Sequence, residues 1–177
     1  VVVMYHRFGE SAYPSTNIKL EQFEGHLREL SKPKYSVLPI PEIVSRLKSG
    51  SPLPDRTVGI TIDDAFLSVY QKAFPRFKKM GLPFTLFVAT RPIDQNLKGY
   101  MSWDQIRELK KTGVTIGSQT NSHLHMAQAS DSDNRIDLQA SNSRFRAELG
   151  ETPNIIAYPY GEYSLAVGRL SQEEGLI

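Results

Sequence analysis

The sequence contains no cysteine, which excludes disulfide bonds and thiolate metal sites. It also has no strong excess of charge, since 21 basic and 19 acidic side chains leave a net charge of +2. The basic residues do not cluster on one segment, so nothing indicates a nucleic-acid partner. No apolar run approaches the length of a membrane-spanning helix, about 18 residues, and we expect no membrane insertion.

Targeting signals are missing as well. The chain opens on VVVMYH, without an initiator methionine or the basic segment of a signal peptide. It closes on SQEEGLI, which is typical of a helix end that leads into another strand. We therefore expect residues 1–177 to form a single domain that is truncated at both ends and lacks its last strand or strands.

Apolar, β-branched runs alternate with helical patterns along the chain. Strands are predicted at 1–6, 57–63, 84–90, 114–119 and 154–161. Helices are predicted at 17–30, 40–50, 66–81, 102–113, 134–149 and 163–174. Pro75 predicts a kink or break in the third of these helices. The βαβα order predicts an α/β fold, a mostly parallel sheet or barrel covered by helices, with its active site at the C-terminal ends of the strands.

Two adjacent carboxylates, Asp63 and Asp64, stand at the end of the strand at 57–63. Like charges placed side by side raise one pKa, and a cation beside them relieves the repulsion. One division of labour has one aspartate bind a metal while the other takes a proton from the metal-bound water. In the alternative, Asp64 caps the next helix and Asp63 is solvated.

The segment SQTNSHLHM, at the end of the strand at 114–119, holds further candidate ligands. Gln119 and His123 have the i, i+4 spacing of many metal ligands, and His125 follows two residues later. A glutamine offers only a neutral amide oxygen, a poorer zinc ligand than imidazole or carboxylate. A solvated loop with incidental histidines is the alternative. In AYPYGEYS, the Pro-Tyr-Gly turn either aims a backbone N–H at a developing oxyanion or simply ends a strand.

Taken in order, TIDDAF, MSWDQIREL, the histidine loop and YPYG resemble the polysaccharide deacetylases, the NodB-homology domain of carbohydrate esterase family 4. The resemblance runs from VVVMYHRFGE to YPYG and so covers most of the chain. It implies a distorted (β/α) barrel. It also implies metal-dependent hydrolysis of an N-acetyl or O-acetyl group on a glycan, with zinc as the expected divalent metal and an acetylated glycan as the partner.

The resemblance also implies roles for single residues. Asp63 matches the family's catalytic base, which activates the metal-bound water, and Asp64 matches its metal-binding aspartate. The metal-binding His-(Ser/Thr)-x-x-His motif falls on Gln119 to His123, and Tyr160 matches the residue whose backbone N–H holds the oxyanion. Substrate contacts are expected from three further residues: Trp103, Pro159 and His6, the last in a YH opening like that of the poly-N-acetylglucosamine deacetylases.

Four departures accompany the resemblance. Gln119 replaces the first metal-binding histidine, Ala65 replaces a glycine, and Ala157 replaces an arginine that orients the base. The family's late Leu-x-x-His motif does not occur before Ile177. Three hypotheses therefore stay open: an active deacetylase with an altered metal site, a degenerate domain that binds glycan, and a hydrolase of small amides with the same fold. An extracytoplasmic location is implied by the resemblance alone.

Overall fold

The computed structural model describes all 177 residues and contains one main parallel sheet. The sheet has the order β1 (Val2–Tyr5), β5 (Thr57–Ile62), β6 (Thr85–Val88) and β7 (Thr115–Ser118), and β4 (Ser36–Val37) also pairs with β5. Every one of these pairings is parallel. The predicted α/β fold with a parallel sheet is therefore confirmed.

The central strands β5 and β6 are buried along nearly their whole length because both of their faces are covered. In β5, Ile60 and Ile62 are buried, and in β6, Leu86 and Val88 are fully buried. Strands of a parallel sheet are covered by helices on both faces and so show continuous apolar runs rather than alternation. These side chains belong to a hydrophobic core of 21 buried residues that fixes the position of the strand ends.

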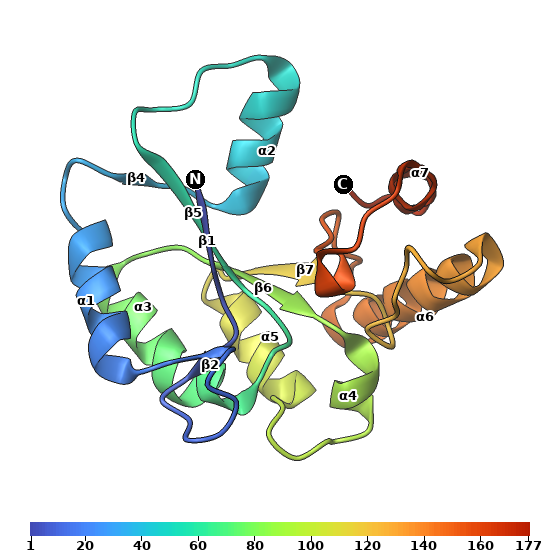
Figure 1. The fold of residues 1–177 in the computed structure, drawn as a ribbon, viewed down its shortest axis with the longest axis horizontal. Helices are drawn as coiled ribbons and strands as arrows, with labels where there is room; N and C mark the ends of the chain where they lie inside the picture. Colours follow the sequence, from blue (N-terminus) through green and yellow to red (C-terminus); the bar gives the residue numbers. More distant parts are fainter.

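The helices follow one another around the sheet, from α1 and α3 at the left of Figure 1 to α6 and α7 at the right. Their bounds are α1 (Leu20–Leu30), α2 (Ile40–Ser49), α3 (Phe74–Met80), α4 (Thr90–Asp94), α5 (Trp103–Lys111), α6 (Asp131–Leu149) and α7 (Leu165–Glu173). Six of the seven correspond to predicted helices, and the short α4 was not predicted. No helix combines the length and the apolar character that crossing a membrane requires.

The predicted break at Pro75 is confirmed. A π-helical segment, Val69–Ala73, precedes α3, and the Phe74 N–H donates to the Val69 carbonyl five residues earlier. Proline has no N–H and crowds the preceding turn, and the single π-helical turn here widens the helix just before it. Pro75 then occupies the first turn of α3, where its missing N–H costs nothing.

The strand predicted at 154–161 is much shorter than expected. Only Ile156 forms a parallel bridge, with Ser118, supported by a bond from the Ala157 N–H to the Ser118 carbonyl at 3.0 Å. Pro159, which has no N–H for a ladder, then begins a 3₁₀ turn, η2 (Pro159–Gly161). Two short strands not predicted, β2 (Arg7–Phe8) and β3 (Asn17–Ile18), pair with each other in a separate small sheet.

Candidate active site

Asp63 and Asp64 stand where β5 ends. The Asp63 N–H donates to the Tyr5 carbonyl of β1 at 2.9 Å, and the side chain is buried, with 8% of the residue exposed. Asp64 and Ala65 then take positive φ values of 71° and 53°, which turn the chain sharply out of the sheet. Such left-handed conformations are strained for residues other than glycine, and they cluster at functional sites.

The environment of Asp63 disfavours its charge. Burial, and secondly the neighbouring negative charge of Asp64, raise the pKa of Asp63 to about 7. His6 is the only basic side chain within 4.0 Å, with its Nε2 3.9 Å from the Asp63 Oδ2. Residue 157, where the family pattern has an arginine, is an alanine in this chain and so supplies no cation to Asp63. A carboxyl group with a pKa near 7 is well placed to accept a proton at neutral pH.

Gln119 lies beside this pair, at the end of β7. It is 3% exposed, and its Oε1 accepts a hydrogen bond from the Asp64 N–H at 3.1 Å. The backbone bond that sets this position runs from the Gln119 N–H to the Val88 carbonyl, at 2.9 Å. A carbonyl oxygen has two lone pairs, so one of them is still available to a cation.

His123 faces Asp64. Its Nε2 lies 3.4 Å from the Asp64 Oδ1, and burial is the chief cause that lowers the pKa of His123, with Asp64 opposing it. Two ligands on a tetrahedral zinc ion with bonds of about 2.0–2.1 Å lie about 3.3 Å apart. The pair therefore fits a divalent cation, whereas no group of three His, Cys, Asp or Glu side chains is brought together around one.

His125 does not join the Asp64–His123 pair as a third ligand. Its Nδ1 lies 3.0 Å from the Glu162 Oε1, and its ring stacks on that of Tyr160 with centroids 3.8 Å apart. The Gln128 Nε2 donates to the same Glu162 oxygen at 3.1 Å. Glu162 was not predicted as a site residue, although it directly follows the Pro-Tyr-Gly turn. The hydrogen bond to Glu162 holds His125 against the Tyr160 ring and not beside the Asp64–His123 pair.

Tyr160 is the exposed member of the site. Its φ is 60°, its residue exposure is 59%, and the edge of the His123 ring contacts it at a centroid distance of 4.6 Å. The Tyr160 N–H has no backbone partner, unlike the N–H of Gly161, which donates to the Tyr158 carbonyl at 2.9 Å. The turn thus leaves one backbone donor without a partner, in the residue whose ring contacts His123. The preceding Pro159 is buried and offers little surface to a substrate.

A buried carboxylate on α6 holds the loop that carries His123. The Asp137 Oδ2 accepts hydrogen bonds from the N–H groups of Asn121 at 2.8 Å and Ser122 at 3.1 Å. The loop needs such support because Thr120 and His123 both have positive φ values, 67° and 58°. No local pattern marks Asp137, since the pairing depends on how α6 docks against the end of β7.

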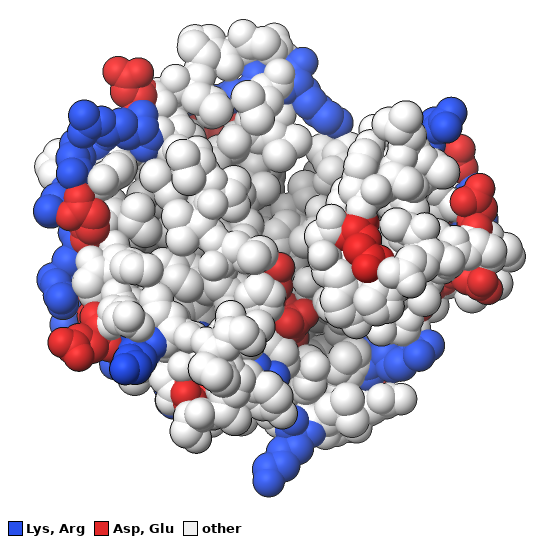
Figure 2. Space-filling model, in the orientation of Figure 1, with Lys and Arg blue, Asp and Glu red and all other residues white.

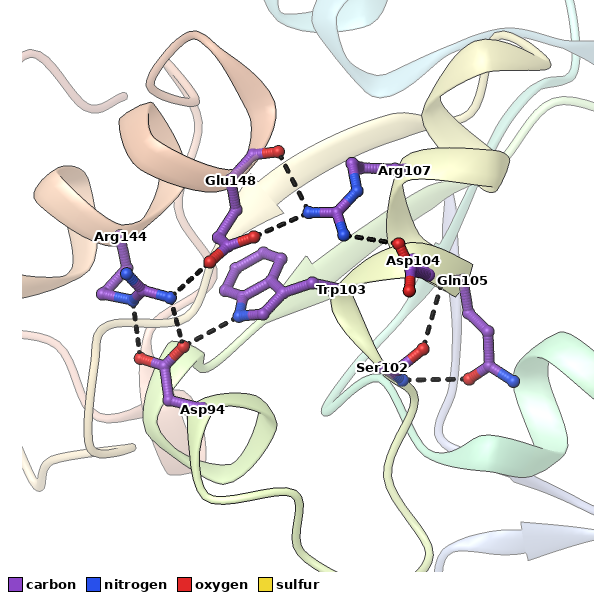
Figure 3. Close-up of polar contacts among 8 residues, drawn as sticks. All are labelled: Asp94, Ser102, Trp103, Asp104, Gln105, Arg107, Arg144 and Glu148. Atoms are coloured by element: carbon purple, nitrogen blue, oxygen red, sulfur yellow. Dashed lines mark hydrogen bonds and ion pairs between the residues drawn. The ribbon is translucent and has the colours of Figure 1, made fainter.

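Trp103 does not join this group. Its indole N–H donates to the Asp94 Oδ1 at 2.8 Å, and the Arg144 side chain binds both oxygens of Asp94 (Figure 3). The ring is 8% exposed and packs edge-on against Phe145. The tryptophan therefore links α4, α5 and α6 through buried contacts, which argues against the direct substrate contact that the sequence suggested.

Comparison with known proteins decides the family. The family model described as polysaccharide deacetylase matches residues 50–176, most of the chain. The chain belongs to the polysaccharide deacetylase family. The match includes β5 with its two aspartates, the histidine loop and the Pro-Tyr-Gly turn.

Relatives match most of the chain at low identity. The Bacillus subtilis protein YxkH is 26% identical over 174 residues, 98% of this chain and 61% of its own length. The poly-β-1,6-N-acetyl-D-glucosamine N-deacetylase of Staphylococcus aureus is 28% identical over 157 residues, 82% of this chain and 54% of its own length. The chain thus spans little more than half the length of these relatives.

Solved structures share the fold. IcaB from Ammonifex degensii is 26% identical, with a TM-score of 0.90 over 99% of this chain and 80% of its own. The Streptococcus pyogenes deacetylase PplD, in complex with acetate, is 22% identical, with a TM-score of 0.88 over 98% of this chain and 79% of its own. A mutant of BA3943, described as a pseudoenzyme of the same family with restored activity, matches 67% of this chain and 42% of its own at 21% identity and a TM-score of 0.59.

Proposed function

We propose that this chain is the catalytic domain of a hydrolase that removes acetyl groups from an amino-sugar polysaccharide. The observation that carries the proposal is the buried Asp63, whose pKa is raised to about 7, beside an Asp64–His123 pair separated by 3.4 Å. A strained turn that places two carboxylates together destabilises the fold, so a role in stability alone does not explain it. Amide hydrolysis at neutral pH uses such a base.

In this mechanism, Asp63 accepts the proton that the attacking water loses. The carbon of the acetyl group then carries a negative oxygen, to which the free N–H of Tyr160 donates a hydrogen bond. The bond from carbon to nitrogen breaks, and Asp63 returns its proton to the leaving amine. The products are acetate and a free amino sugar.

A divalent cation would fit between Asp64 and His123, with the Gln119 oxygen in the third position. When bound, such a cation polarises the acyl oxygen and makes a coordinated water more acidic. Gln119 adds only an amide oxygen that already accepts the Asp64 N–H. We therefore expect zinc to bind more weakly than it does at sites with three strong protein ligands.

The surface supports a polymer more than a small amide. Figure 2 shows a hollow near the centre of this face with carboxylate side chains in it, while basic side chains lie mainly at the outline. Open surface pockets of about 280 Å³ and 460 Å³ lie against the starts of the strands, lined by residues such as Phe84 and Thr115, and contain no site residue. An acidic hollow also suits an amino-sugar product, which is a cation. N-acetylated glucosamine polymers, as named for the staphylococcal relative, are the proposed substrates, and an extracytoplasmic location goes with them.

The test measures acetate released from a β-1,6-linked N-acetylglucosamine pentamer by protein supplied with Zn²⁺, Co²⁺ or Mn²⁺. We expect release by the wild-type chain and none by Asp63→Asn, while Asp55→Asn, at an exposed position away from the site, releases acetate normally. Binding of the pentamer without acetate release under any metal would contradict the proposal.

Pentamer binding without acetate release would identify a glycan-binding domain that has lost its catalytic activity. Gln119 is the observation that favours it, because the substitution removes an imidazole from a ligand position. Restoration of acetate release by Gln119→His would then locate the loss of activity in this one residue.

A further inference from the structure

Tyr13 is a large aromatic side chain that the structure leaves in water. The residue is 61% exposed, and its φ is 61°, a conformation that is strained for a tyrosine. An exposed ring buries little apolar surface, so hydrophobic burial does not offset the strain of this backbone conformation. Backbone strain of this kind is found at ligand contacts and other functional positions.

The inner face of the Tyr13 ring rests on a fixed cation. The guanidinium carbon of Arg7 lies 4.4 Å from the centre of the Tyr13 ring and 3.4 Å from that of Phe66, and Arg7 also donates to Glu10 at 2.9 Å. A cation on a ring face contributes about 0.5–1 kcal/mol at an exposed site. The ring of Tyr13 is therefore held in place before any ligand arrives.

The loop that carries Tyr13 is anchored at its base. The Ser68 hydroxyl accepts from the Phe8 N–H at 3.2 Å and donates to Glu10 at 2.6 Å, and Lys72 donates to the Gly9 carbonyl at 2.7 Å. Pairing of β2 with β3 closes the loop. These contacts fix the loop to the segment that follows the two aspartates. They therefore hold the Tyr13 side chain at a defined place on the surface.

The stack of Tyr13, Arg7 and Phe66 continues toward the candidate active site. Phe66, two residues after Asp64, packs against Tyr100 with ring centroids 4.9 Å apart. Arg7, which lies against both Tyr13 and Phe66, directly follows His6, whose Nε2 lies 3.9 Å from the Asp63 carboxylate. The Tyr13 ring is therefore connected through Arg7 and Phe66 to the residues on either side of the candidate active site.

We propose that Tyr13 is a sugar-stacking subsite, which binds a pyranose ring adjacent to the sugar whose acetyl group is hydrolysed. One face of a β-linked pyranose presents C–H groups, which pack on the electron-rich face of an aromatic ring. A ring already ordered by Arg7 loses little entropy on binding. The subsite rests on the proposed function, because it assigns Tyr13 to a glycan with several sugars.

The test is calorimetric titration with the β-1,6-linked N-acetylglucosamine pentamer and, separately, the monomer. For Tyr13→Ala, we expect pentamer affinity to fall about 10-fold, with monomer affinity unchanged, since the monomer occupies the catalytic position only. Tyr13→Trp should keep the pentamer affinity. Tyr13→Asn should bind as weakly as the alanine variant and be more stable than the wild type, because asparagine tolerates a positive φ.

The matched control is Tyr35→Ala. Tyr35 also carries a cation over its ring, the Lys34 Nζ at 4.8 Å, but it precedes β4 at the opposite ends of the strands. This variant should bind the pentamer like the wild type.

Equal pentamer affinity in Tyr13→Ala and the wild type, or a wild type that does not bind the pentamer, would overturn the subsite. If the wild type releases acetate but Tyr13→Ala has an unchanged KM for the pentamer, the subsite fails and the proposed function stands. If no acetate is released but Tyr13→Ala loses pentamer binding, the subsite stands and the proposed hydrolysis fails.

Discussion

Replacing Asp63 with asparagine should stabilise the protein, and the gain should depend on pH. The folded state raises the pKa of this carboxyl from 3.8 to about 7, chiefly through burial. A shift of about 3 units corresponds to about 4 kcal/mol, because one pKa unit is worth 1.36 kcal/mol. Asparagine keeps a similar shape and removes the buried charge.

The sign of the pH dependence follows from where the proton is bound. Below about pH 4, Asp63 is protonated in both the folded and the unfolded state, and it does not affect stability. Between about pH 4 and pH 7, the unfolded chain has lost this proton and the folded chain keeps it, so the wild type loses stability as the pH rises. Above pH 7 the loss is complete.

The assay is urea denaturation of the wild type and Asp63→Asn at pH 4 and pH 8, with a chelator present. We expect equal stability at pH 4 and a gain of up to about 4 kcal/mol for the variant at pH 8, or roughly 8 to 16 °C in Tm. Adding Zn²⁺ should reduce the gain, because a cation beside Asp64 lowers the pKa of Asp63. A difference that is the same at both pH values, or one that the exposed control Asp55→Asn reproduces, would refute the reasoning.

Three further changes test the surroundings of the site. Gln119→His should raise Zn²⁺ affinity about 100-fold by calorimetry, while the lost bond to the Asp64 N–H lowers stability by about 1 kcal/mol; unchanged affinity would exclude this position as a ligand. Asp137→Ala should cost about 2–4 kcal/mol and weaken Zn²⁺ binding, and Asp137→Asn should cost less because it still accepts; equal costs would contradict the charged bonds to the loop. Gly117→Ala should cost about 1–3 kcal/mol in urea denaturation, because its Cβ would collide with the Phe87 ring; a neutral result would contradict the packing of β6 and β7.

The main elements of the fold could be predicted because their signals are local. A run rich in β-branched residues, such as that at 57–63, predicts a buried strand, and Pro75 marks the break between the π-helical segment and α3. The strand at 154–161 was predicted too long because an apolar run does not reveal how many neighbours a strand has. Here its pairing with β7 is limited to the single bridge at Ile156.

The candidate site was predictable only where its residues form an ordered series along the chain. Asp63, Asp64 and His123 are placed together by the convergence of parallel strand ends, which a sequence can anticipate. Glu162 and Asp137 act through bonds to groups 37 and 15 or 16 residues away, and no spacing rule reports such contacts. The prediction for Trp103 did not account for Asp94 and Phe145, which together bury the indole.

Of the four departures from the family's pattern, the exchange at Gln119 is the one that falls on a proposed metal ligand. Because Asp64 has a positive φ, its N–H points toward the end of β7, where the amide oxygen of Gln119 accepts it. An imidazole that binds a metal through one nitrogen presents its other nitrogen as a donor, so it cannot accept the same N–H. Glutamine therefore stabilises the strained turn by accepting the Asp64 N–H. In the proposed mechanism, this substitution leaves Asp63 and its raised pKa in place, so we expect it to change how tightly a cation is held and not which group takes the proton.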